Sequence, residues 1–113
     1  DPMHRYDFPV GVSYGSDVDL VTRTLKEALD AQPEILRDPV PEVSFENFGE
    51  STLDFHVYYW LEVRTHNARD IGTHMRVLIA QLFKERGIEM AFPQRDIRLI
   101  PSKPIQVRLE KDS

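Results

Sequence analysis

The residues of this 113-residue chain that could carry out chemistry are four histidines and an excess of carboxylates. The histidines are His4, His56, His66 and His74, and no two are separated by the two, three or four residues that commonly place metal ligands together. The chain has no cysteine, which removes thiolate ligands, disulfides and the commonest covalent nucleophile. The sequence therefore predicts no metal site, no cofactor and no nucleophilic catalysis.

The remaining polar residues are typical of helix ends and turns. Carboxylates such as Asp17 and Asp30 are expected to cap a helix or face solvent. Gly11 and Gly15 separate a strand pattern from a helix pattern, but neither Gly-x-Gly-x-x-Gly nor Gly-Lys-Ser/Thr is present, so an ordinary turn is expected instead of a phosphate loop. These residue types indicate a protein that is not an enzyme.

Composition limits the class of protein further. The length suits one compact domain, and the formal net charge of -5 comes from interspersed signs, so nucleic acid is not expected as a partner. The lack of cysteine is compatible with a reducing, cytoplasmic compartment. No apolar run approaches the roughly 20 residues that a membrane-spanning helix needs.

The first half of the chain predicts strand, helix, strand. Residues 6–14 alternate apolar and polar side chains, as a half-buried strand does, and Pro9 and Gly11 favour a sheet edge. Ser16, followed three residues later by an acid, predicts a helix cap, with the helix beginning near residue 17 and ending before Pro33. Three prolines between residues 32 and 41 predict a stiff loop, after which Val43 begins a second strand.

A hairpin through residues 49–51 is predicted to lead into a third strand over residues 53–63. One face of this strand is apolar. The opposite face carries Tyr58 and Trp60 where solvent exposure alone would favour charges, and this predicts contact with another chain, with cover by the chain's own loops as the alternative.

The second half predicts a helix capped near Asn67, with an apolar stripe facing the core and Gly87 in a left-handed conformation just beyond its end. Ile97 and Leu99 predict a fourth short strand. A last alternating segment holds Ile105, Val107 and Leu109. Strand, helix, strand, strand, helix, strand is typical of an α+β ferredoxin-like sandwich, with both helices on one face of a mostly antiparallel sheet.

Several blocks of residues, in this order along the chain, resemble the small-conductance mechanosensitive channel (MscS) family. The blocks are residues 10–17, Asp38 to Phe45, Phe48 to Ser51 and residues 88–96. Their residues Tyr14, Gly15, Asp17, Phe92, Pro93 and Gln94 form the family motif, which we interpret as structural. The resemblance places a C-terminal α/β domain at residues 5–100 and an extension at residues 101–113.

This resemblance implies a parent channel that releases ions and small solutes during hypo-osmotic shock. The chain would then be a soluble domain on the cytoplasmic side of the inner membrane, attached to transmembrane helices outside this sequence, in a homo-heptamer. It implies assembly and vestibule functions, with no enzymatic step. The segment from Ile105 to Leu109 would add a strand to a small barrel on the symmetry axis.

Two other hypotheses stay open at this point. A free-standing ferredoxin-like module could bind a small metabolite between subunits, and a ligand-dependent rise in melting temperature would support it. An acylphosphatase-like hydrolase would need positive charge in the loop after the first strand, where Asp17 makes this loop acidic.

Overall fold

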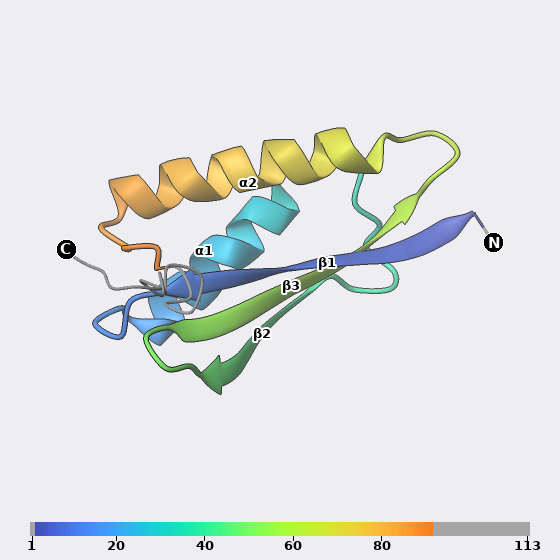
Figure 1. The fold of residues 1–113 in the computed structure, drawn as a ribbon. Coiled ribbons are helices and arrows are strands. Elements are labelled where there is room, and N and C mark those ends of the chain that lie inside the picture. The colour runs from blue at the N-terminus through green and yellow to red at the C-terminus, as the bar shows by residue number, and fades with distance from the viewer. Residues whose placement is uncertain (1, 92–113) are drawn as a thin grey trace, which may run out of the picture.

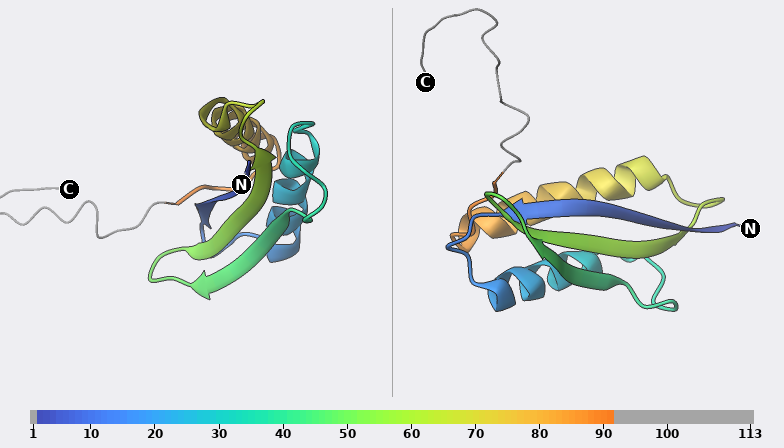
Figure 2. Two further views of the ribbon diagram at one scale, coloured as in Figure 1. Left: turned by 90° about the vertical axis from the view of Figure 1, so that its right-hand side faces the viewer. Right: turned by 60° about the horizontal axis from the view of Figure 1, so that its bottom comes forward.

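The computed structural model describes residues 2–91, which form a two-layer α+β domain. In chain order the elements are β1 (Met3–Val12), α1 (Val18–Asp30), β2 (Glu42–Phe48), β3 (Leu53–Glu62) and α2 (Ala68–Glu85). The strands pair antiparallel in the order β1-β3-β2. Both helices lie on the same side of this sheet (Figure 1, Figure 2). The predicted fold class is confirmed, whereas the fourth strand at Ile97 and Leu99 lies outside the described residues.

The core lies between the sheet and the helices. Along β3, buried and half-buried side chains alternate strictly, because successive residues of a strand point to opposite faces. The apolar stripes of the helices pack on the buried face, and each large side chain there contributes about 1.5–3 kcal/mol relative to an exposed one. The helix residues buried in this core are Val21, Leu25, Ala28 and Leu29 of α1 and Ile71, Met75, Ile79 and Phe83 of α2.

The first strand differs in its bounds from the prediction of residues 6–14. β1 begins earlier because it pairs with β3 over its whole length, from Met3 opposite Glu62 to Val12 opposite Leu53. It ends earlier because the amide of Ser16 donates to the carbonyl of Ser13 at 3.1 Å and closes a turn. Within residues 2–91, β1 lies at one end of the three-stranded order, as predicted, and its outer side meets an isolated bridge between Val12 and Met90.

The helix caps are placed by short polar side chains. Asp17, not the predicted Ser16, caps α1, because its carboxylate accepts from the amide of Leu20 at 3.2 Å. Asn67 caps α2 as predicted, with its side chain accepting from the amide of Arg69 at 2.9 Å. Gly87 has φ of 69°, which confirms the left-handed residue after α2.

The proline-containing loop after α1 is attached to both layers. Ile35 is buried, and the amide of Leu36 donates to the carbonyl of Trp60 at 3.0 Å. The guanidinium of Arg37 donates to the carbonyls of Leu29 and Gln32 at 3.2 and 3.1 Å, and thereby satisfies acceptors at the end of α1. These contacts fit the predicted ordered loop.

After α2 the chain returns along the free edge of β1. The amide of Ser13 donates to the carbonyl of Glu89 at 2.9 Å, and the amide of Ala91 donates to that of Gly11 at 3.0 Å. A Cβ atom at Gly11 would lie 2.9 Å from the Ala91 oxygen, so glycine permits this close approach.

Candidate functional site

The sheet face opposite the helices is uncovered within residues 2–91 and gathers polar and aromatic side chains from all three strands. Strand register decides which side chains share it, because paired residues of antiparallel strands point to the same side. Asp7 is paired with Tyr58, and Tyr58 with Glu42. This open face carries Arg5 and Asp7 from β1, Glu42, Ser44 and Glu46 from β2, and Asp54, His56, Tyr58, Trp60 and Glu62 from β3.

Tyr58 lies at the centre of the open face and touches a side chain from each neighbouring strand. The guanidinium carbon of Arg5 lies 5.0 Å from the centre of its ring, within the range of a cation–π contact. Its hydroxyl donates to Oε2 of Glu46 at 3.1 Å. Loss of hydration, followed by this hydrogen bond to a carboxylate, raises the pKa of Tyr58 above its usual value. Tyr58 is therefore held in one orientation and stays a neutral donor.

His56 extends this network to β1. Its Nε2 lies 2.7 Å from Oδ1 of Asp7, and its ring stacks on that of Tyr58 with centroids 4.9 Å apart. The imidazole, the phenol and the carboxylate therefore fix one another across the β1–β3 pair. His56, for which the sequence predicts no metal-binding role, thus has a carboxylate partner.

Trp60 follows on the same face, half-buried, beyond Tyr58. It is paired with Arg5 across β1 and β3. The structure thus places both predicted interface aromatics on the uncovered side of the sheet. Their contact with another chain stays a prediction.

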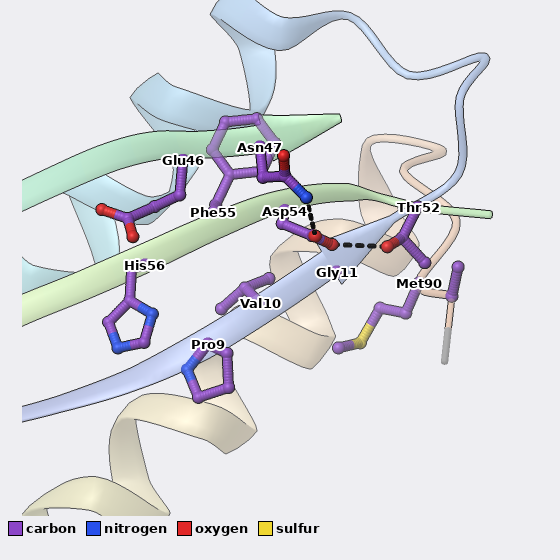
Figure 3. A pocket seen from close by; sticks show the side chains of 11 residues that line it. Pro9, Val10, Gly11, Glu46, Asn47, Thr52, Asp54, Phe55, His56 and Met90 are labelled. Atoms are coloured by element: carbon purple, nitrogen blue, oxygen red, sulfur yellow. Dashed lines mark hydrogen bonds between the residues drawn. The ribbon is translucent and has the colours of Figure 1, made fainter. Parts of the chain in front are cut away.

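A shallow groove of about 490 Å³ lies between the end of β1 and the β2–β3 hairpin (Figure 3). Its most prominent polar group, Asp54, accepts from Nδ2 of Asn47 at 3.3 Å and from the hydroxyl of Thr52. Within residues 2–91, no three histidine or carboxylate side chains are placed to hold a metal ion. The carboxylate of Asp54 thus stabilises the hairpin.

Three residues of the family motif lie between β1 and α1, and two have clear structural contacts. Tyr14 lies in the turn after β1, and its hydroxyl donates to the carbonyl of Gly49 in the β2–β3 hairpin. Asp17 caps α1. Gly15 has open space where a Cβ atom would be, so its packing does not require glycine.

Ser13 stands in the sequence Gly11-Val12-Ser13-Tyr14-Gly15, which matches the Gly-x-Ser-x-Gly pattern of serine hydrolases. The absence of cysteine alone therefore does not exclude a nucleophile, because this serine pattern is present in the sequence. In the structure the hydroxyl of Ser13 lies 3.3 Å from that of Ser16, and no histidine of residues 2–91 is hydrogen-bonded to it. The pattern therefore lacks the base that activates a serine nucleophile.

The other predicted site residues lie outside the described part of the chain. They are Phe92, Pro93 and Gln94 of the motif and Ile105, Val107 and Leu109 of the predicted assembly strand. Their roles stay predictions.

Sequence reasoning missed the charged partners of Tyr58. Arg5, Asp7 and Glu46 lie more than ten positions from it, and only the strand register brings them together. The alternation of apolar and polar residues predicted which residues of each strand face outward, but it did not predict which residues of neighbouring strands are paired. A signal was nevertheless present in the sequence. The arginine and the acids alternate in step with the outward-facing positions of their strands, which places them on the same face of the sheet.

The fold and this face define a class of protein: a small α+β module whose organised surface is a polar and aromatic sheet face. No helix in residues 2–91 is both long and apolar enough to cross a bilayer. Residues 6–90 match the family model described as mechanosensitive ion channel MscS, C-terminal. The chain belongs to the MscS family of mechanosensitive channels and contains its C-terminal domain.

Relatives and solved structures agree with this assignment. An uncharacterised MscS family protein of Haemophilus influenzae is 41% identical over 95 residues, which are 84% of this chain and 8% of that protein. Mechanosensitive channel MscK of Escherichia coli is 34% identical over 107 residues, 95% of this chain and 10% of that protein. The closed-state crystal structure of Helicobacter pylori MscS matches with a TM-score of 0.74 and 25% identity, over 88% of this chain and 39% of that one.

The chain therefore spans a tenth or less of the length of the H. influenzae and E. coli proteins and about two fifths of the H. pylori channel structure. Arabidopsis thaliana MSL1, at 9% identity and a TM-score of 0.64, shares the fold. The membership is thus shown for one domain of a channel family.

Proposed function

We propose that this domain builds part of the cytoplasmic vestibule of a mechanosensitive channel and helps to hold its subunits together. The observation that carries the proposal is the family match over residues 6–90, which covers the described sandwich except for the first three residues of β1. The 34% identity to a protein named as a mechanosensitive channel supports the parent function. The parent would release ions and small solutes on hypo-osmotic shock.

In this proposal the domain lies on the cytoplasmic side of the inner membrane in a homo-heptamer, and conduction belongs to transmembrane helices outside this sequence. The contribution of the domain is mechanical. A well-packed core with a hydrogen-bonded, uncovered sheet face provides a rigid unit with a surface for neighbours.

The test is expression of the complete parent protein in a bacterial strain without its own mechanosensitive channels. We expect survival of a sudden drop in osmolarity and a tension-activated current in excised membrane patches. A parent that is inserted in the membrane but gives no such current would overturn the channel function. Removal of this domain from the parent should lower the number of assembled channels, measured as the mass of the detergent-extracted complex.

The predicted assembly strand has its own test. Deletion of residues 104–113 should weaken self-association if Ile105, Val107 and Leu109 join subunits. An unchanged mass of the assembly would count against that role.

A further inference from the structure

A second cleft, separate from the groove at the hairpin, lies between the side of α2 and the edge of β1. Its volume is about 240 Å³. Pockets for drug-sized ligands run from about 300 to 1,000 Å³, so this cleft suits a small group instead of a large molecule. The lining residues that matter for its chemistry are Arg69, Gly72 and Arg76 of α2, Tyr6 and Asp7 of β1, and Tyr59 of β3.

The hydroxyl of Tyr59 is a buried donor at this cleft. Tyr59 is only 3% exposed, and its ring packs against those of Tyr6 and Phe8, with centroids 6.1 and 6.3 Å away. Within residues 2–91, its hydroxyl has no hydrogen-bond partner. Buried polar groups are nearly always paired, so an unpaired one at a cleft indicates a missing ligand. Loss of hydration raises the pKa of Tyr59, so the hydroxyl is a neutral donor at neutral pH.

Arg76 is held beside this hydroxyl. Its guanidinium carbon lies 4.8 Å from the centre of the Phe8 ring, a cation–π contact that fixes its direction. A Cβ atom on Gly72 would lie 3.1 Å from Nη1 of Arg76 and 3.7 Å from the hydroxyl of Tyr59. Glycine is unfavourable inside a helix, and here its missing side chain leaves room where the guanidinium and the hydroxyl come together.

The charges at the cleft favour an anion. Neither Arg69 nor Arg76 forms a salt bridge with another residue in the described chain. The carboxylate among the lining residues, that of Asp7, already has His56 as its partner at 2.7 Å. Asp70 follows Arg69 in sequence but does not line the cleft.

We propose that this cleft binds a phosphate group, either as free inorganic phosphate or as part of a small metabolite or lipid headgroup. Guanidinium groups bind phosphate oxygens through paired N–H donors. Two guanidiniums and the hydroxyl of Tyr59 offer three donor side chains, which suits the several oxygens of phosphate better than the two of a carboxylate. The inference goes beyond the assembly role, because it gives the domain a ligand that would tie α2 to the edge of the sheet.

The test is a titration of the isotope-labelled 113-residue chain with inorganic phosphate, followed by nuclear magnetic resonance. Sodium chloride of equal ionic strength is the baseline. We expect saturable shifts of the Gly72 amide and of the side-chain Nε–H groups of Arg69 and Arg76. Arg76→Gln should weaken binding about tenfold, because it removes a charged donor. Arg23→Gln, an equal charge change at an exposed residue of α1, is the matched control and should leave binding unchanged.

Two further variants separate binding from folding. Tyr59→Phe removes only the hydroxyl, so it should weaken phosphate binding while the melting temperature without phosphate stays the same or rises. Gly72→Ala should also weaken binding, because its Cβ atom displaces the guanidinium of Arg76. Melting curves of the parent chain should move to higher temperature as phosphate is added, and those of Arg76→Gln should move less. A loss of stability in Tyr59→Phe with unchanged phosphate binding would show that the hydroxyl is structural.

Vesicles distinguish the two sources of phosphate. Sedimentation with phosphatidylglycerol vesicles but not with phosphatidylcholine vesicles, lost in Arg76→Gln, would assign a lipid headgroup to the cleft. Phosphate-dependent shifts without vesicle binding would assign a soluble ligand. Shifts no larger than those in sodium chloride, equal binding of acetate, or unchanged binding by Arg76→Gln would overturn the inference. None of these results depends on channel current or on assembly, so the inference and the proposed function can fail separately.

Discussion

At the tip of the β2–β3 hairpin, Gly49 lies where three polar atoms crowd the backbone. A Cβ atom there would come within 2.8 Å of the Asp54 carboxylate and 2.9 Å of the Thr52 carbonyl. Gly49 also accepts the hydroxyl of Tyr14, so a shift of its backbone would disturb the link between the hairpin and the turn after β1. Gly15, in that turn, has no positive φ, and no atom lies within 4 Å of the position that a Cβ atom would take.

This contrast predicts opposite results for one chemical change at two glycines. Gly49→Ala should lower the free energy of unfolding by about 1–3 kcal/mol, because the hairpin must move to make room. Gly15→Ala should leave it unchanged or raise it by about 0.4–1 kcal/mol, because alanine restricts the unfolded chain without a clash. Urea unfolding of both variants measures this, and equal destabilisation would contradict the assignment of the hairpin as the crowded site.

For single residues, the sequence predicted the face on which a side chain lies better than the residues that the side chain contacts. Tyr58 and Trp60 were placed on the outward face from alternation alone, and Gly87 was placed in the left-handed region from its position after a helix. Tyr14 was predicted to continue the strand but lies in the turn, because the end of a strand is decided by its pairing partner. His56 and Asp7 are 49 positions apart, and no local pattern indicates their contact.

At the scale of one element, two neighbouring residues, Ser16 and Asp17, are candidates for the residue that caps the start of α1. The spacing of Ser16 and Asp19 predicted a serine cap, yet the carboxylate of Asp17 accepts the amide of Leu20. Asp17→Ala should therefore lower the free energy of unfolding by about 0.5–2 kcal/mol, and Ser16→Ala by less. Thermal unfolding followed by circular dichroism measures both variants. A larger loss for Ser16→Ala would show that the serine caps the helix in solution.

The two helices are joined by a polar contact at one end of their packed surface. Arg86, just after α2, donates to the buried hydroxyl of Thr24 at 3.0 Å and forms a salt bridge with Glu27 at 2.9 Å. The hydrogen bond from this guanidinium, with its positive charge, holds the pKa of Glu27 below the usual value of 4.5. A carboxylate with a lowered pKa in the folded state stabilises that state above its unfolded pKa, and this contribution disappears as pH falls through the folded value.

It follows that Glu27→Gln should lower the melting temperature at neutral pH, by a small amount because Glu27 is exposed, and should have a smaller effect well below pH 4.5. Melting of the variant and the parent chain at both pH values measures the difference. Glu50→Gln is the matched control, since Glu50 is on the surface and forms no salt bridge within the described chain. An equal effect of Glu27→Gln at both pH values would show that its charge does not matter.

Across the whole molecule, the layered arrangement followed from the order of elements in the sequence. Two helix periods and three strand periods, with the apolar side of each strand known, leave few ways to bury both stripes on one sheet. The function of the uncovered face did not follow in the same way, because its chemistry depends on charges contributed by three strands. Those charges become a pattern only when the register and the layers are known.

The single tryptophan of the chain makes this uncovered face directly observable. Trp60 lies half-buried on the open sheet face, so docking of a second copy there should remove water from its ring. We expect its fluorescence emission to shift to shorter wavelength, and its quenching by acrylamide to fall, as the chain is concentrated at low ionic strength. Added salt should reverse both changes, because it screens the charges around the contact. The same chain kept dilute at the same ionic strength is the control and should show neither change. A rise in sedimenting mass without any change at Trp60 would mean that the copies join through a surface other than the open sheet face.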